Sequence, residues 1–310
     1  MATWIIKAAL QHVIGRLPAS YWVNGLFQKY VTNGYYPSQE IFEGKLKCCR
    51  QHLDHYLKFS ETSRGGLTAF ELGTGPWPIV PIGLYLCGAS EIITYDLVPT
   101  LRRDTLRRTL ELFSKSANGG LLDRILGAVQ PVRLRGLGNV LRRVEEETPT
   151  QSLSQLNIQV RIGDARASAL PDNSMDLIFS TVVLEHIDAK ILRGLLAEFR
   201  RIAKPYAVMS HCVGLADQYA SFDKSITPFN FLKYSDRQWR VFNNPVIPQS
   251  RLRLADYRDI FRFSGWKIVE EHNTFGLMDD LNKIRLAPEF AKYSTEDLLV
   301  LVSWLIARLQ

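Results

Sequence analysis

The sequence predicts an α/β protein with a mainly parallel β-sheet and helices on both of its faces. Apolar segments of strand length alternate with longer segments of helical periodicity from residue 67 onward, and this alternation is typical of parallel sheets with right-handed crossovers. The first of these apolar segments ends in two closely spaced glycines, Gly73 and Gly75, which lead into a helical segment. In such folds ligands bind at the carboxyl ends of the strands, so the residues at those ends are the first candidates for a functional site.

Residues 1–66 are expected to form an N-terminal helical cap. Apolar residues recur there at helical spacing, and a turn-forming segment at 33–37 interrupts them. The expected helices cover 6–17, 21–30 and 40–59. Tyr35 and Tyr36 in the turn are candidate substrate-binding residues, with a packed turn as the alternative.

The turn after the first strand is the clearest candidate for a ligand-binding site. Its glycines, Gly73 and Gly75, can bring bare backbone N–H groups close to a ligand. The second strand, 92–95, ends in Asp96, twenty-one residues after Gly75, and a carboxylate at this spacing can accept hydrogen bonds from both hydroxyls of a ribose. A nicotinamide dinucleotide site has the same spacing, but here Pro78 occupies the position of its third glycine.

Four segments resemble class I S-adenosylmethionine-dependent methyltransferases in the order of that family's motifs. Glu71 to Gly75 resembles the first motif, E/D-x-G-x-G-x-G, with Trp77 where the family prefers its third glycine. The other three are Asp164-Ala165 after the third strand, 176–186 with its Leu-Glu-His end, and Lys204-Pro205 before the fifth strand. The resemblance covers about 67–210 together with 265–271.

The resemblance implies that residues 67–310 form a Rossmann-like, seven-stranded, mainly parallel sheet. Residues 299–308 then form the last, antiparallel strand, with a helix as the alternative. S-adenosyl-L-methionine is the implied cofactor and a small molecule the implied substrate. The cofactor-binding residues that follow from it are Glu71, Gly73, Thr74, Gly75, Trp77, Asp96, Leu97, Asp164, Ala165, Ser180 and Thr181.

Residues 98–157 are longer than a connection between neighbouring strands requires, and they are expected to form an inserted basic helical lid. Helices are expected around 106–113, over 121–129 and from 141, with a Gly- and Arg-rich connection at 131–138. Ten basic and three acidic residues lie between 101 and 144, which accounts for the whole net charge of +7. This segment is predicted either to bind an anionic substrate or nucleic acid, or to be a solvated charged face. Nucleic acid is disfavoured because aromatic residues for base stacking are almost absent there.

Residues 211–264 form a second insertion, which is expected to be an aromatic-rich substrate cap. An aromatic-lined pocket suits a largely apolar or ring-bearing small molecule. The alternative is a satellite core that holds a long loop together. The candidate substrate-binding residues in this insertion are Tyr219, Trp239 and Arg251.

Two histidines at predicted strand ends are candidates for the catalytic base. Methyl transfer from a sulfonium is an in-line displacement, so the enzyme has to align the reactants and remove a proton, and histidine suits the second task. His211, after the fifth strand, is the first candidate, with Asp217 to orient it or to contact the substrate. His186 is the second candidate, and its alternative role is to brace the fold beneath the cofactor.

Methylation of a hydroxyl on a small specialised metabolite is the predicted reaction. Base-amino methylation is disfavoured because 180–183 (S-T-V-V) stands where an N/D-P-P-Y/F sequence would follow the fourth strand. Three alternatives stay open: N- or C-methylation of a small molecule, an RNA methyltransferase that uses the basic insertion, and a cofactor-binding scaffold without catalysis.

Composition indicates an ordinary soluble globular protein, with 46% hydrophobic and 22% charged residues. No apolar run reaches the ~20 residues of a membrane span. Lys7, His12 and Arg16 interrupt any apolar core of a secretory signal. The four cysteines and the acidic residues show no metal-ligand spacing, so no metal is expected, and a reducing cytoplasmic setting is the simplest prediction.

Overall fold

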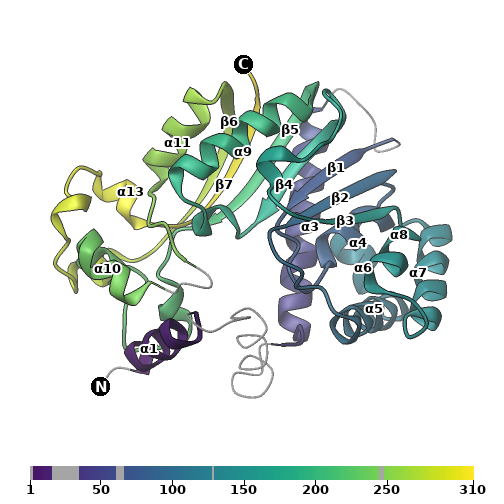
Figure 1. Ribbon diagram of the computed structural model, residues 1–310, viewed down its shortest axis with the longest axis horizontal. Helices are drawn as coiled ribbons and strands as arrows, with labels where there is room; N and C mark the ends of the chain where they lie inside the picture. Colours follow the sequence, from purple (N-terminus) through teal and green to yellow (C-terminus); the bar gives the residue numbers. More distant parts are fainter. Residues whose placement is uncertain (1–2, 16–34, 61–65, 128, 244–247) are drawn as a thin grey trace. The chain divides into compact units, whose positions relative to one another are not determined.

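The computed structural model describes residues 3–15, 35–60, 66–127, 129–243 and 248–310 (Figure 1). The helix expected over 21–30 lies outside these ranges. In the described part of the chain, seven strands form one mixed sheet in the order β3-β2-β1-β4-β5-β7-β6, which confirms the predicted Rossmann-like fold. The strands are β1 (Thr68–Leu72), β2 (Glu91–Asp96), β3 (Ile158–Ile162), β4 (Met175–Thr181), β5 (Ala203–Gly214), β6 (Trp266–Phe275) and β7 (Val300–Leu309).

Helices make up much of the remaining described chain. The α-helices are α1 (Thr3–Gly15), α3 (Gln39–Phe59), α4 (Ile79–Leu86), α5 (Arg103–Asn118), α6 (Leu121–Leu126), α7 (Pro131–Arg143), α8 (Pro149–Ser154), α9 (Ala189–Ile202), α10 (Asp236–Phe242), α11 (Leu254–Phe263), α12 (Met278–Asn282) and α13 (Thr295–Leu299). Among the 3₁₀-helices are η1 (Ala165–Ala167), η2 (Leu184–His186) and η3 (Gln218–Ser221). Within the described ranges, none of the helices has both the length and the apolar content that crossing a bilayer requires.

Parallel pairings bring the candidate cofactor residues to one end of the sheet. β1 lies between β2 and β4, with Glu71 opposite Thr94 on one side and Phe179 on the other. β3 continues the sheet beside β2, where Asp96 is paired with Ile162. Because these strands run in the same direction, their carboxyl ends meet, and so do the loops that follow them.

The C-terminal segment is a strand, which decides between the two predicted alternatives. Leu215 N–H, just after β5, donates to the Leu301 carbonyl at 2.7 Å. Gly276 N–H, just after β6, donates to the Leu299 carbonyl at 2.8 Å. Both bonds join the end of one strand to the start of β7, so β7 runs antiparallel to its two neighbours, as predicted.

The basic insertion contains α5, α6, α7 and α8, which Figure 1 shows grouped near β3. The expected connection at 131–138 is wrong, because α7 begins at Pro131 and ends at Arg143. Proline suits the first position of a helix, where its missing N–H would have no intrahelical partner. Gly136 lies inside α7, where a Cβ would come within 2.8 Å of the Tyr85 hydroxyl. This glycine therefore allows close packing and does not mark a loop.

The described chain divides into two compact units. The first unit contains α1 with Val182–Arg193 and Cys212–Leu305, and the second contains the described parts of Gly34–Thr181, Gly194–His211 and Ile306–Gln310. In the first unit, the aromatic insertion packs with α1 into a hydrophobic core. Its members are Trp4, Ala8, Tyr219, Phe229, Phe231, Leu232, Trp239, Leu281, Ala287, Phe290 and Leu298.

Candidate active site

The turn between β1 and α4 borders open space. Gly73 and Gly75 have positive φ angles of 78° and 68°, which glycine tolerates and other residues rarely adopt. Gly73 N–H donates to the Tyr95 carbonyl at 2.8 Å, which fastens the turn to the end of β2. A Cβ placed on Gly75 would meet no atom within 4 Å, so a ligand can approach the backbone there.

Two carboxyl groups with little access to water flank this turn. Asp96 accepts a hydrogen bond from Gly75 N–H, with distances of 3.3 and 3.2 Å to its two oxygens, and burial raises the pKa of Asp96 to about 6. Glu71 accepts a hydrogen bond from the Thr74 hydroxyl at 2.6 Å, and burial raises its pKa to about 7. Burial disfavours the charged form of both carboxyl groups. A cationic ligand beside them would favour their ionisation and would itself be stabilised by the two negative charges.

The segment with Tyr35 and Tyr36 lies against the glycine turn. The Trp77 indole N–H donates to the Tyr35 carbonyl at 3.1 Å. The hydroxyls of Tyr35 and Tyr36 donate to Asp104 of α5 at 3.1 and 3.2 Å, and their rings meet edge to face with centroids 4.9 Å apart. The two tyrosines therefore lie beside the predicted cofactor turn, where Trp77 and Asp104 hold them.

The loop after β3 carries Asp164 and Ala165. Gly163 N–H donates to the Asp96 carbonyl at 2.9 Å, which joins this loop to the end of β2. The Asp164 side chain is 46% exposed. It accepts hydrogen bonds from the Arg166 guanidinium at 2.9 and 3.0 Å, and this contact lowers the pKa of Asp164. Ala165 is buried as the first residue of η1, so Asp164 is the more accessible of the two.

The end of β4 is enclosed by buried histidines. Ser180 Oγ is 2.8 Å from His211 Nδ1, and Thr181 Oγ1 is 3.1 Å from His52 Nε2 of α3. His211 is fully buried, and burial lowers its pKa to about 3. The structure thus makes His211 an enclosed, neutral imidazole beside Ser180, an environment that suits a structural role better than proton removal from a substrate.

S-adenosylmethionine fits the groups at the ends of β1, β2 and β3. Leu97 leaves 71% of its surface exposed beside Asp96, which suits the face of an adenine ring. Asp96 ends β2, where a carboxylate can bind ribose hydroxyls. Glu71 and Asp96 together offer negative charge to a sulfonium and an ammonium group, and the open space at Gly75 leaves room for the ligand.

A pocket of about 730 Å³ lies in the first unit, with walls from η2, η3, the end of β5 and the start of β7. Its volume suits a small organic molecule. Of the predicted catalytic residues, His186 and Asp217 line it. The full lining is Val182, Glu185, His186, Gly214, Ala216, Asp217, Gln218, Ala220, Ser221, Lys224, Ile226, Pro228, Gln249, Leu301 and Val302.

His186 is fixed in one tautomer by its surroundings. Its Nδ1 lies 2.8 Å from the Pro248 carbonyl oxygen, which only accepts, so Nδ1 carries the proton and Nε2 keeps its lone pair. Burial lowers the pKa of His186. The preceding Glu185 is held by Gly214, whose N–H donates to Oε1 at 3.2 Å. His186 is therefore a neutral imidazole with a proton-accepting nitrogen.

Val182, also in the pocket wall, has a strained backbone. Its φ is 58°, an angle that is a genuine outlier for a β-branched side chain. The Val182 N–H donates to the Cys212 carbonyl at 2.8 Å, and the side chain is 50% exposed. Strained residues of this kind concentrate at functional sites, which makes this pocket a candidate site on backbone evidence as well.

Asp217 is buried in the pocket wall with both carboxylate oxygens engaged. Oδ1 accepts from Tyr219 N–H at 2.8 Å, and Oδ2 accepts from the Asn230 side-chain amide at 3.0 Å. Burial raises the pKa of Asp217. Through these bonds Asp217 caps η3 and holds the side chain of Asn230 in place.

Tyr219, Trp239 and Arg251 pack inside the first unit and are not among the residues that line the pocket. The Tyr219 hydroxyl donates to the Phe242 carbonyl at 2.9 Å. The Arg251 guanidinium lies 5.5 Å from the centroid of the Trp239 ring and donates to the Phe231 carbonyl at 3.0 Å. Their surroundings correspond to the satellite core, because the long insertion needs these contacts to hold its own loops together.

Several residues at these sites were not predicted. Glu185 was visible in the Leu-Glu-His segment but was not assigned to a site. Lys224 and Gln249 line the pocket from irregular segments, where no spacing relates them to the strands. The positive charge of Lys45 on α3 offsets part of the burial effect that raises the pKa of Glu71 and of Asp96. No local sequence pattern connects α3 with the glycine turn.

Similar solved structures come from several organisms. A chain of the complex between the Haloferax volcanii Trm112 methyltransferase activator and the putative methyltransferase is 15% identical, with a TM-score of 0.44 over 86% of this chain and 92% of that one. The S-adenosylmethionine dependent methyltransferase from Mesorhizobium loti is 15% identical, with a TM-score of 0.44 over 87% and 98%. Haemonchus contortus phosphoethanolamine N-methyltransferase 2, in complex with S-adenosyl-L-methionine, is 13% identical, with a TM-score of 0.45 over 92% and 59%. No curated protein matches the chain.

A family model described as a methyltransferase domain matches residues 137–210. The matched span begins in α7 and includes β3, β4, α9 and the first part of β5. It therefore contains both the loop at Asp164 and the segment that ends in His186. The matched span covers less than half of the chain, so this comparison shows that residues 137–210 are similar to a methyltransferase domain, within a chain whose strand order is Rossmann-like.

Proposed function

We propose that this chain is an S-adenosyl-L-methionine-dependent methyltransferase that acts on a hydroxyl group of a small specialised metabolite, with His186 as the proton acceptor. The observation that carries the proposal is the place of His186 in the wall of the 730 Å³ pocket, with Nδ1 bound to the Pro248 carbonyl. That bond leaves Nε2 as the proton-accepting nitrogen. When bound, the cofactor supplies an electrophilic methyl group on a positively charged sulfur.

In this proposal Nε2 of His186 would accept the proton that the substrate hydroxyl loses. The cofactor would supply the methyl group to the substrate oxygen, and its sulfur would leave as the neutral thioether. Since burial lowers the pKa of His186, the ring is neutral near pH 7 and available as a base. Alignment of the oxygen with the methyl carbon is the other requirement of this reaction.

Residues at the ends of β1 and β2 would hold the cofactor in this proposal. Asp96 would bind the ribose hydroxyls, Leu97 would cover the adenine, and the open backbone at Gly75 would leave room for the rest of the molecule. The positions of Asp164 and Ala165 suit contacts with the adenine edge. Trp77, Ser180 and Thr181 act indirectly, because their polar groups already bond to Tyr35, His211 and His52.

The lining of the pocket supports a small substrate with an apolar body. Val182, Ile226 and Leu301 contribute apolar walls, while Glu185 and Lys224 contribute charge. Pockets that bind drug-sized molecules commonly combine apolar walls with a few convergent polar groups. A small hydroxylated ring compound matches this combination.

A substrate panel combined with pocket filling tests the proposal. Phenols, alcohols and amines of similar size are offered with S-adenosylmethionine, and release of S-adenosylhomocysteine is measured. Ser221 is exposed and lines the pocket, so Ser221→Trp should block the substrate without disturbing the core. The matched control is Phe222→Trp, at an exposed neighbour that is not in the lining.

The proposal predicts that the parent methylates hydroxyl compounds. Ser221→Trp should lower this activity by about tenfold or more, since the loss of a binding contact of about 1.4 kcal/mol has this effect. Phe222→Trp should stay near the parent. Turnover of amines alone would instead favour the N-methyltransferase alternative. Equal activity in both variants would show that the substrate does not use this pocket.

A further inference from the structure

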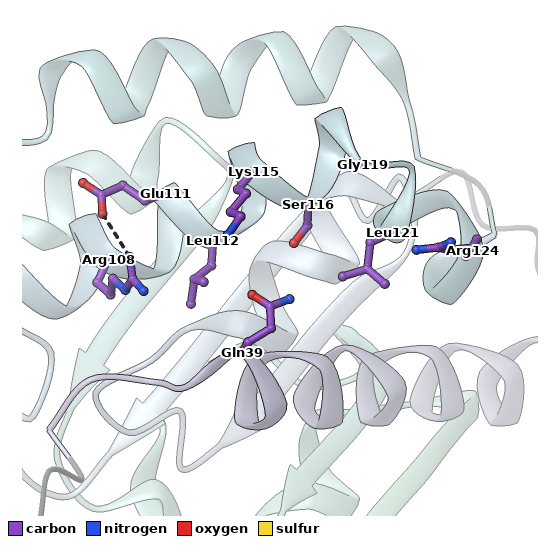
Figure 2. A pocket seen from close by; sticks show the side chains of 9 residues that line it. All are labelled: Gln39, Arg108, Glu111, Leu112, Lys115, Ser116, Gly119, Leu121 and Arg124. Atoms are coloured by element: carbon purple, nitrogen blue, oxygen red, sulfur yellow. Dashed lines mark ion pairs between the residues drawn. The ribbon is translucent and has the colours of Figure 1, made fainter.

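A second pocket, of about 640 Å³, lies on the basic insertion in the second unit (Figure 2). We call it the basic pocket. It is formed by the first turn of α3, by α5 from Arg108 onward, by Gly119 and by α6. Its lining is Gln39, Arg108, Glu111, Leu112, Lys115, Ser116, Gly119, Leu121 and Arg124. None of the residues assigned to the cofactor or to the substrate pocket belongs to this set.

Positive charge predominates in the basic pocket. Three cations, Arg108, Lys115 and Arg124, face a single acid, Glu111. Glu111 is bound more closely to Arg107, at 3.0 Å, than to Arg108, at 3.7 Å. Its charge therefore compensates a cation outside the pocket as well as one inside.

Two of these cations have no compensating group among the described residues. In the described part of the chain, no ion pair or hydrogen bond engages the side chain of Lys115 or of Arg124. They come from different helices, with the turn at Gly119 and Gly120 between them, and Gly120 has a φ of 66°. This turn sets Lys115 and Arg124 on one pocket, as Figure 2 shows.

The remaining lining offers an apolar floor and neutral hydrogen-bonding groups. Leu112 is buried and Leu121 partly buried, while Ser116 and Gln39 supply a hydroxyl and an amide. The segment 101–144 around the pocket holds the whole net charge of +7, so its field attracts anions. The cavity has the size of a small-molecule site.

We propose that the basic pocket binds a small molecule that carries a phosphate or diphosphate group. Lys115 and Arg124 offer an anionic group two cationic donors on the lining, and Arg108 offers a third. Charge-assisted hydrogen bonds of this kind are the stronger ones. Aromatic side chains, on which nucleic-acid bases would stack, are absent from the lining.

Titration calorimetry with inorganic pyrophosphate at low ionic strength tests this site. The test variant is the double substitution Lys115→Ala and Arg124→Ala. The matched control is Lys47→Ala with Arg135→Ala, which removes one lysine and one arginine from exposed positions of the same unit, on α3 and α7. Titration with S-adenosylmethionine serves as the folding check for both variants.

Pyrophosphate is expected to bind the parent and the control similarly and the test variant at least about tenfold more weakly, because two charge-assisted contacts are lost. Lysine in the last turn of a helix is also favoured by the helix dipole alone. No heat with the parent, or equal weakening in both variants, would therefore overturn the proposal in favour of a solvated basic surface. A single-stranded RNA that binds more tightly than pyrophosphate and depends on Lys115 and Arg124 would overturn it in favour of nucleic acid.

Discussion

His186 and His211 show how two environments give one residue type two roles. His186 lines a pocket, and its Nδ1–H is fixed by the Pro248 carbonyl. His211 is fully buried, with Nδ1 2.8 Å from the Ser180 hydroxyl. Burial lowers the pKa of both rings, so both are neutral near pH 7. Access to a pocket, and not the protonation state, is what separates a candidate base from a structural histidine.

The largest expected effect that distinguishes the two histidines is on the pH dependence of turnover. His186 has to be neutral to accept a proton, so kcat/KM should rise about tenfold per pH unit below its pKa and be level above it. Burial lowers this pKa from 6.5, so the plateau should already be reached at neutral pH. The measurement is kcat/KM at saturating cofactor from about pH 5 to 8. If His211→Asn shifts the inflection in the pH profile and His186→Asn does not, His211 would be the base and His186 the structural histidine.

His211 is expected to matter for stability instead. His211→Leu should lower the free energy of unfolding by about 1–3 kcal/mol, because the buried Ser180 hydroxyl loses its partner. The double variant with Ser180→Ala should recover part of this loss. In the parent, folded His211 stays neutral down to about pH 3, whereas the unfolded chain binds a proton below about 6.5, so stability falls as pH falls through this range. Urea unfolding at several pH values checks whether His211→Leu removes that part of the slope.

The carboxyl pair at the glycine turn is expected to show the opposite pH dependence. The pKa values of Asp96 and Glu71 are raised to about 6 and about 7, so the folded protein without cofactor loses stability as pH rises from about 4 to 7. A cationic cofactor favours the charged carboxylates, so the thermal shift with S-adenosylmethionine should grow between about pH 5.5 and 7.5.

S-adenosylhomocysteine is the matched ligand for this experiment, because it lacks the sulfonium charge. Its thermal shift should change less with pH, and Asp96→Asn should flatten the response to both ligands. A shift with S-adenosylmethionine that is the same at every pH would argue against a role for these carboxylates in holding the cation.

The smallest expected effect tests the aromatic insertion. Tyr219→Phe removes the hydrogen bond to the Phe242 carbonyl and should cost about 1 kcal/mol of stability. KM for the substrate should stay at the parent value, because Tyr219 belongs to the core and not to the pocket lining. A marked rise in KM would instead support the prediction that Tyr219 binds the substrate.

Much of the fold could be predicted because the relevant patterns are local. The glycine turn after β1, the spacing to Asp96 and the apolar run of β4 all depend on residues close in sequence. The position of α7 could not be predicted in this way. Pro131 and Gly136 together are typical of a connection, and the contact between Gly136 and Tyr85 that explains the glycine is tertiary.

The candidate site was predictable in part for the same reason. Asp96, Asp164 and His186 follow strands, so their positions follow from the order of the sheet. The environment of Trp239 depends on α1, whose Trp4 joins the same core from the other end of the chain. A dense aromatic segment indicates apolar packing, but its sequence does not reveal whether a ligand or the protein itself fills the space.

Kinetics of His186→Asn test the central claim most directly. Asparagine keeps an N–H donor for the Pro248 carbonyl and removes the proton-accepting Nε2. With saturating S-adenosylmethionine and a hydroxyl substrate, kcat should fall by about 10²–10³, the usual contribution of a general base, while cofactor affinity stays unchanged. A His186→Asn enzyme with a kcat close to the parent value would contradict the assignment of His186 as the base.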